Sequence, residues 1–172
     1  MTAEPAAAPP RWLTPGELEA WLPVGGLLLR LPAALDAQMQ RDSGLSHFDY
    51  LVLASLSEAP GRTRRMSALA ALANGSLSRL SHVVKRLEAK GWIERRACPE
   101  DGRYTNAVLT DAGWDKVLAS APGHVEVVRA LVLDALTGGE LAQLGDMARR
   151  ILARVDATSD RPGSDPAAPC RS

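Results

Sequence analysis

Two predicted helices joined by a tight turn constrain the fold of this chain more than any other feature. A short helix is predicted over residues 68–73, the turn has the sequence Asn74-Gly75-Ser76, and a longer helix is predicted over residues 77–90. Serine stands at the N-cap of both helices, and Gly91 follows the second as a helix stop. Asn and Gly tolerate the positive φ angles of a tight turn. The two helices must therefore cross, which leaves one face of the second helix exposed.

A β-hairpin is predicted directly after the longer helix. Residues 92–96 and 106–109 have the composition of short strands, and residues 99–103 (PEDGR) form a turn-rich tip between them. Residues 62–65 are interpreted as a short basic connector that precedes the two helices. The predicted fold class is mostly α with a small β-hairpin wing (α+β), that is, a winged helix-turn-helix.

Further helices are predicted on both sides of this module. Thr14 and Glu17 form a capping box for a first helix that Pro23 and Pro32 should kink or split. Ser46 opens a second helix with Asp49 at N3. Thr110 opens a third helix that the Pro-Gly pair at 122–123 interrupts or kinks, and a last helix begins at a capping box of Thr137 and Glu140. The expected organisation is an N-terminal arm (1–12), a dimerisation helix (13–43), the winged module (44–110), two dimerisation helices (111–156) and a disordered tail (157–172).

Positive charge is concentrated in the winged module. The whole chain has 20 Lys and Arg and 20 Asp and Glu, which excludes a uniformly basic coat. Residues 61–103, however, hold ten Lys and Arg against four Asp and Glu, a local charge of +6. Such runs are usually a solvated face. Here the charge coincides with a helix-turn-helix, which favours binding to a phosphate backbone.

The predicted DNA contacts lie on one stripe of the longer helix. Arg79, His82 and Arg86 share this stripe, while Leu80, Val83, Val84 and Leu87 form the core-facing side. The guanidinium fork of Arg79 suits the O6 and N7 edge of guanine. His82 fits a base or a phosphate equally well, and an arginine at the wing tip suits a narrow minor groove. The predicted contact residues are Ser76, Ser78, Arg79, Ser81, His82, Lys85, Arg86 and Arg103, with Asp101 orienting an arginine.

Three segments together resemble the MarR family of bacterial transcriptional regulators. They are residues 77–96 (LSRLSHVVKRLEAKGWIERR), residues 99–104 (PEDGRY) and residues 108–113 (VLTDAG). The resemblance implies a homodimer whose terminal helices form the dimer domain. It also implies that Ser78, Arg79, Ser81, His82 and Arg86 face the major groove and Arg103 the minor groove. Members commonly bind small phenolic or lipophilic effectors between the dimer helices and the DNA-binding module.

The terminal helices independently predict a dimer. Their apolar stripes are too extended to bury within one small chain, and pairing across a two-fold axis would place two recognition helices on one face of a duplex. An intramolecular three-helix bundle is the alternative. The predicted dimerisation residues are Leu28, Leu31, Leu35, Val128, Val132, Leu136, Leu141, Leu144 and Ile151.

An effector pocket is the weakest of the functional predictions. Trp21, His47, Tyr50 and Trp114 could line it, although aromatic residues at such positions are more often core. Cys98 beside two arginines leaves open a lowered thiol pKa. The three histidines are widely spaced, which gives no support to a metal sensor.

Other function classes find little support in the sequence. It contains no Gly-rich phosphate loop, nucleophile elbow or His-Glu-x-x-His motif, so we expect neither an enzyme nor a cofactor. The N-terminus lacks the pattern of a signal peptide, and the apolar stretch 22–35 is too short and too broken to span a membrane, so we expect a cytoplasmic protein. The main hypothesis is a ligand-responsive repressor that binds a pseudo-palindromic operator. The alternative is a winged-helix module for protein contact without specific DNA binding.

Overall fold

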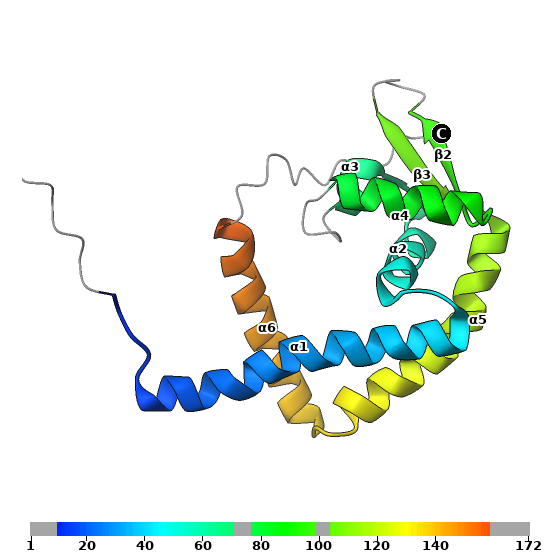
Figure 1. Ribbon diagram of the computed structural model, residues 1–172. Coiled ribbons are helices and arrows are strands. Elements are labelled where there is room, and N and C mark those ends of the chain that lie inside the picture. The colour runs from blue at the N-terminus through cyan, green and yellow to red at the C-terminus, as the bar shows by residue number, and fades with distance from the viewer. Residues whose placement is uncertain (1–9, 71–76, 99–103, 159–172) are drawn as a thin grey trace, which may run out of the picture. The chain divides into compact units, whose positions relative to one another are not determined.

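The computed structural model describes residues 10–70, 77–98 and 104–158 of the 172-residue chain. The chain divides into two compact units, and the boundary lies within the first helix, after Ala34. The elements (Figure 1) are α1 (Pro15–Ser43), α2 (His47–Ser57), η1 (Pro60–Arg62), β1 (Thr63–Arg65), α3 (Met66–Ala70), α4 (Leu77–Ala89), β2 (Ile93–Ala97), β3 (Thr105–Leu109), α5 (Asp111–Val128), η3 (Arg129–Leu133) and α6 (Gly138–Thr158).

Helix α1 is continuous through both prolines, so of the two expected outcomes, a kink or a split, the split is wrong. It begins at the predicted capping box, in which the Thr14 N–H donates to a Glu17 carboxylate oxygen at 2.7 Å. Pro23 and Pro32 both lie inside the helix. Each proline removes only one backbone donor, and the side chains around both are exposed to solvent. As an unbroken helix, α1 is the one described element that meets the length and hydropathy of a membrane span, contrary to the prediction. The mostly buried core helix of a soluble protein and an N-terminal signal sequence pass the same test, and only 6% of the apolar window of α1 is buried.

Helix α2 is the centre of the hydrophobic core. Ser46 is its N-cap, and the reciprocal hydrogen bonds between Ser46 and Asp49 confirm the predicted capping box. Val52, Leu53 and Leu56 are completely buried. They belong to one cluster that also includes apolar residues of α3, α4, β2, β3 and α5.

The hairpin is part of a three-stranded antiparallel sheet in the order β1-β3-β2. The strand β1 occupies residues that we expected to be a connector, and it pairs Thr63 with Val108 and Arg65 with Asn106. A strand of three residues is too short to show alternation in the sequence, and its pairing partner lies more than forty residues away. Helix α3 begins at Met66, before the predicted start.

Helices α4 and α5 closely follow the predicted bounds. Gly91 has a φ of 74°, as expected after a helix end, and Thr110 caps α5 by accepting a hydrogen bond from the Gly113 N–H at 3.0 Å. Of the two outcomes predicted at Pro122, an interruption or a kink, the interruption is wrong, because α5 continues to Val128. The irregular turn comes later, as the π-helical segment η3. Figure 1 shows α4 above α2, with the hairpin extending from beyond its C-terminal end.

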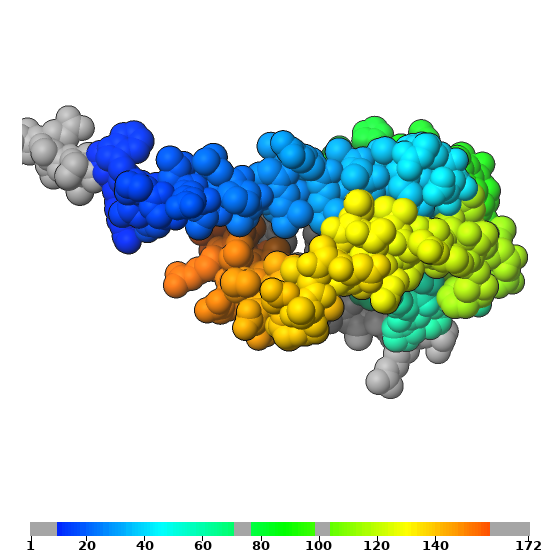
Figure 2. Space-filling model, turned by 90° about the horizontal axis from the view of Figure 1, so that it is seen from below, coloured from blue at the N-terminus to red at the C-terminus, as the bar shows by residue number. Residues whose placement is uncertain are grey.

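Helix α6 contains no buried residue. Its predicted capping box is present, with the Thr137 N–H donating to Glu140 at 2.8 Å. The side chains of α6, orange in Figure 2, project from the surface of the chain. Ile151 and Leu152 are 59% and 57% exposed, which is unusual for large apolar residues on a regular helix.

Candidate nucleic-acid interface

Helix α4 has one buried face and one exposed face. Leu80, Val83, Val84 and Leu87 are buried in the core, as predicted. Ser78, Arg79, His82, Lys85 and Arg86 are exposed and Ser81 is half-buried. The helix is therefore fixed by its apolar side and presents hydroxyl, imidazole, ammonium and guanidinium groups to solvent. These are the donor types that contact phosphates and base edges.

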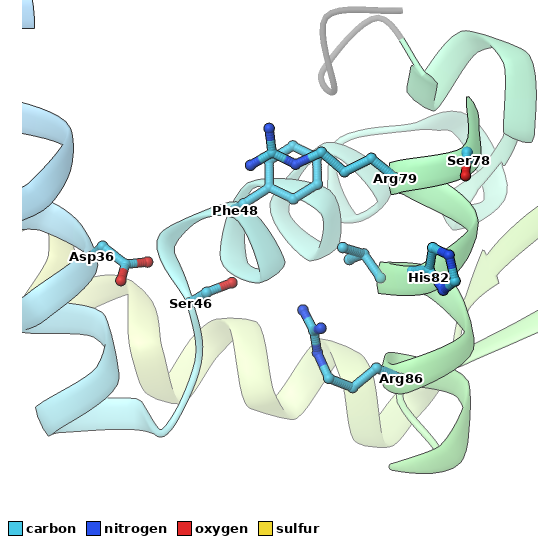
Figure 3. A pocket seen from close by; sticks show the side chains of 8 residues that line it. Asp36, Ser46, Phe48, Ser78, Arg79, His82 and Arg86 are labelled. Atoms are coloured by element: carbon cyan, nitrogen blue, oxygen red, sulfur yellow. The ribbon is translucent and has the colours of Figure 1, made fainter. Parts of the chain in front are cut away.

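A hollow of about 580 Å³ lies between the exposed face of α4, the start of α2 and Asp36 in α1. Two arginines extend from α4 toward α2 across it (Figure 3). The residues that line it are Asp36, Ser46, Phe48, Ser78, Arg79, His82, Val83 and Arg86. The predicted contact stripe thus lines the hollow together with Asp36 of α1, the α2 N-cap Ser46 and Phe48 of α2, none of which we predicted as site residues.

The guanidinium of Arg79 lies over an aromatic ring. Its central carbon is 5.1 Å from the centroid of the Phe48 ring, a cation–π distance. Figure 3 shows the side chain of Arg79 extended from α4 across Phe48. Stacking on an aromatic ring limits where the guanidinium can move and keeps its N–H donors in one orientation. Such an arrangement suits a residue that contacts a base edge.

The guanidinium of Arg86 forms an ion pair with Asp49 of α2. The Asp49 side chain is only 6% exposed, whereas that of Arg86 is 50% exposed. The other carboxylate oxygen of Asp49 accepts the Ser46 backbone N–H at 3.3 Å. Arg86 is thus in the predicted stripe but is already engaged with a buried carboxylate inside the chain.

Several basic residues of the +6 segment have acidic partners within the structure. Arg62 pairs with Asp111 at 2.9 Å, Arg95 with Glu88 at 2.7 Å and Arg96 with Glu94 at 2.6 Å. The hydrogen bonds from Arg95 hold the pKa of Glu88 below its ordinary value. Asp49 and Asp111 lie outside the segment in sequence but beside it in space. The positive charge available to a ligand is therefore smaller than the sequence count.

Three predicted site residues, Ser76, Asp101 and Arg103, lie outside the described residues. The turn at 74–76 and the wing tip at 99–103 are also outside them. Their predicted roles at the recognition helix and the wing stay predictions.

Two of the predicted effector-pocket residues, His47 and Tyr50, lie together with a third ring. The His47 and Tyr50 rings lie with that of His124, at centroid distances of 5.3 Å from His47 and 4.7 Å from Tyr50. Trp114 instead packs against the core, with the Arg62 guanidinium 4.4 Å from its ring centroid. Trp21 belongs to the other compact unit and is 52% exposed.

The histidine pair corrects our expectation that the histidines are widely spaced. Helix α5 brings His124 to the start of α2, where burial lowers the pKa of both His47 and His124. Asp36 partly offsets this effect on the His47 pKa, whereas His47 lowers the His124 pKa further. Burial also raises the pKa of Tyr50. In the described part of the chain, no group of three or more His, Cys, Asp and Glu could hold a metal ion.

The alternative of a reactive thiol at Cys98 is wrong for this structure. Cys98 is 3% exposed and does not carry a free thiol. Solvent and reagents therefore do not reach its sulfur, and it cannot form a thiolate.

The same fold occurs in solved structures of known regulators. A MarR family transcriptional regulator from Streptomyces coelicolor, Sco3205, solved in complex with DNA, is 41% identical and superimposes with a TM-score of 0.83 over 88% of this chain and 98% of that chain. The regulator AbsC from the same organism is 35% identical, with a TM-score of 0.82 over 87% of this chain and all of that chain. The model of the MarR family matches residues 45–105. This chain belongs to the MarR family of transcriptional regulators.

The curated MarR relatives match over a shorter length. The HTH-type transcriptional regulator YdcH from Bacillus subtilis is 36% identical over 80 residues, which are 45% of this chain and 54% of that protein. The chain therefore spans about half the length of this relative. The family model covers the whole of α2, α4 and β2, so the resemblance is strongest in the module that carries the candidate interface.

Sequence reasoning missed the α2 residues that contact α4 at the candidate interface. Phe48 has no predicted role, and Asp49 is predicted only as the N3 residue of a capping box. Their contacts with α4 cross 31 and 37 positions of sequence. No local periodicity encodes such pairs, and the acidic residue at N3 is already explained by the capping box.

Proposed function

We propose that this chain is a sequence-specific double-stranded DNA-binding regulator of transcription that works in the cytoplasm as a homodimer. One observation carries the proposal: α4 buries its apolar face and exposes Ser78, Arg79, His82 and Lys85 as one polar stripe. A helix mounted in this way can enter a major groove without losing core contacts.

In this proposal the exposed residues have separate roles. Arg79, held over Phe48, donates two hydrogen bonds to a guanine edge. Ser78, Ser81 and His82 contact bases or phosphates, and Lys85 contributes positive charge. Ser76 supplies a further donor at the start of the helix. Arg103 enters the minor groove beside the site, and Asp101 orients an arginine there.

A homodimer is supported by the unburied apolar residues of the terminal helices. Leu28 is 61% and Ile151 is 59% exposed, and α6 has no buried residue. Of the predicted dimerisation residues, Leu141 is also exposed and Leu31, Val128, Val132, Leu136 and Leu144 are partly so. Leu35, in contrast, is buried within the single chain at 8% exposure and contributes to its core. A two-fold pairing would place two α4 helices about 10 base pairs apart on one duplex face.

We also propose that a small lipophilic or phenolic effector releases the protein from its operator, which makes it a repressor. The cluster of His47, Tyr50 and His124 supports this idea, because half-buried imidazoles beside a buried phenol can hydrogen-bond and stack on a phenolic ligand. The Nδ1 atom of His124 is buried and has no hydrogen-bond partner among the described residues.

The test is a selection of genomic fragments by the full-length protein, followed by titration of the selected duplex at several salt concentrations. We expect a pseudo-palindromic site, binding by two chains and a steep fall in affinity with salt. A protein that selects no sequence, but retains an acidic protein partner, would instead be the winged-helix interaction module.

A further inference from the structure

The first turn of α2 contacts both arginines of the recognition helix. Phe48 lies under Arg79, and its neighbour Asp49 pairs with Arg86. The two arginines are seven residues apart and so stand two turns from one another on the same stripe of α4. Two adjacent residues in the first turn of α2 thus contact two arginines that lie two turns apart on α4.

Because the Asp49 carboxylate is buried, its ion pair with Arg86 helps to hold α4 against α2. A carboxylate with a 6% exposed side chain has lost most of its hydration and must be compensated by hydrogen bonds or by a counter-charge. The Ser46 N–H compensates one oxygen and the Arg86 guanidinium the other. If Arg86 turned outward to a base, it would leave a buried carboxylate without its counter-charge.

The start of α2 is itself held in place from α1. The Asp36 carboxylate accepts the His47 backbone N–H, the first N–H of α2, at 2.8 Å. Asp36 belongs to the same compact unit as α2 and α4. Asp49 therefore links α4 to the start of α2, and the Asp36 carboxylate in turn holds that helix start in place.

We propose that Asp49 is a positioning residue for DNA recognition, which acts through Arg86 to hold α4 on α2 so that Arg79 stays seated on Phe48. Arg86 is then not a base-reading residue, although the sequence places it on the contact stripe. This inference rests on the proposed DNA binding. It assigns base contact to Arg79 and the anchoring of α4 to Arg86.

The experiment compares Asp49→Asn, Arg86→Gln and the double variant in the full-length protein, titrated on the duplex that the wild-type protein selects. Asparagine keeps an oxygen that can accept the Ser46 N–H, so the capping box survives while the ion pair is lost. We expect each single variant to bind the selected duplex about tenfold more weakly, and the double variant to be no weaker than either. Binding to an unrelated duplex should be unchanged.

The salt dependence separates an anchoring role from direct contact. If Arg86 anchors α4, the slope of log affinity against log salt is the same for Arg86→Gln and the wild type. Lys85→Gln is the matched control, one position away on the same helix, and should reduce that slope by about 1. Circular dichroism and thermal unfolding of each variant show whether α4 remains folded, and Arg86→Lys should restore part of the lost affinity.

Two results would overturn the inference. Wild-type or tighter binding by Asp49→Asn, with weaker binding and a smaller salt slope for Arg86→Gln, means that Arg86 contacts DNA directly. Additive losses in the double variant mean that Asp49 acts through another group. Failure of the wild-type protein to select any duplex is a different result, because it contradicts the proposed function itself.

Discussion

Gly113 at the start of α5 lies against the backbone carbonyl of Trp92, so closely that a Cβ on Gly113 would be 2.2 Å from that oxygen. The Thr110 N–H donates to the same carbonyl at 3.1 Å, and the Thr110 hydroxyl donates to the Gly91 carbonyl at 2.7 Å. The sequence at 108–113 thus joins the end of the wing to α5. Gly113 is required there for its lack of a side chain, not for a special backbone angle.

Gly113→Ala should destabilise the protein by about 2–3 kcal/mol, because the new methyl group meets backbone and the Leu109 side chain, neither of which can move away freely. Urea unfolding measures the change. Gly139→Ala is the matched control: a Cβ there meets nothing within 4 Å, and this helical position should gain about 0.4–1 kcal/mol. Equal stability of Gly113→Ala and the wild type would contradict the close approach.

Arg79→Ala should weaken binding to the selected duplex by about 1–3 kcal/mol and relax the base preference at one position in each half-site. The physical reason is the loss of a guanidinium that can donate two hydrogen bonds to one base edge. Fluorescence anisotropy with a set of single-base variants of the duplex measures both effects. An equal loss on every sequence would show that Arg79 contacts only phosphates.

Ile151→Asp should weaken dimerisation by about 30-fold or more, because it places a charge in an apolar face that pairing would bury. Sedimentation equilibrium measures the dissociation constant. Ala153→Asp adds the same charge on the opposite side of α6, two residues and about 200° away, and should leave the dimer intact. Similar masses for both variants and the wild type would place the interface elsewhere.

Stability should fall on acidification through the histidine pair. The folded protein holds the pKa of His47 and His124 below 6.5, so the unfolded chain binds more protons just below that pH and unfolding is favoured as the pH falls. Urea unfolding at about pH 7.5 and about pH 5.5 measures this loss. In His124→Gln the loss should be smaller, because one imidazole and its repulsion with His47 are removed.

The exposed residue His82 provides the control for this experiment. His82→Gln replaces an exposed imidazole elsewhere in the chain, on α4, and so controls for the loss of a histidine as such. If His124→Gln and the wild type lose the same stability on acidification, the His47–His124 contact does not control the pH response.

The caps and stripes of the helices could be predicted because they are local. Ser46 with Asp49, Thr137 with Glu140 and the buried side of α4 each depend on residues within one or two turns. The short strand β1, the continuity of α1 through its prolines and that of α5 through Pro122 were not predicted. For β1, the tertiary structure supplies a pairing partner that the local sequence does not show. The two prolines of α1 lie in an exposed stretch, and each removes only one backbone donor.

By itself, the sequence determined which side of α4 faces the core, where the helices begin, and that three segments match those of one regulator family. Only the tertiary structure decided that Arg86 is paired with Asp49, that Arg79 lies on Phe48 and that His124 joins His47. The reason is that residues on one face of a helix recur every three or four positions, so the sequence of that helix alone shows which residues share a face. Contacts between helices join side chains 31 to 77 positions apart and leave no period in the chain.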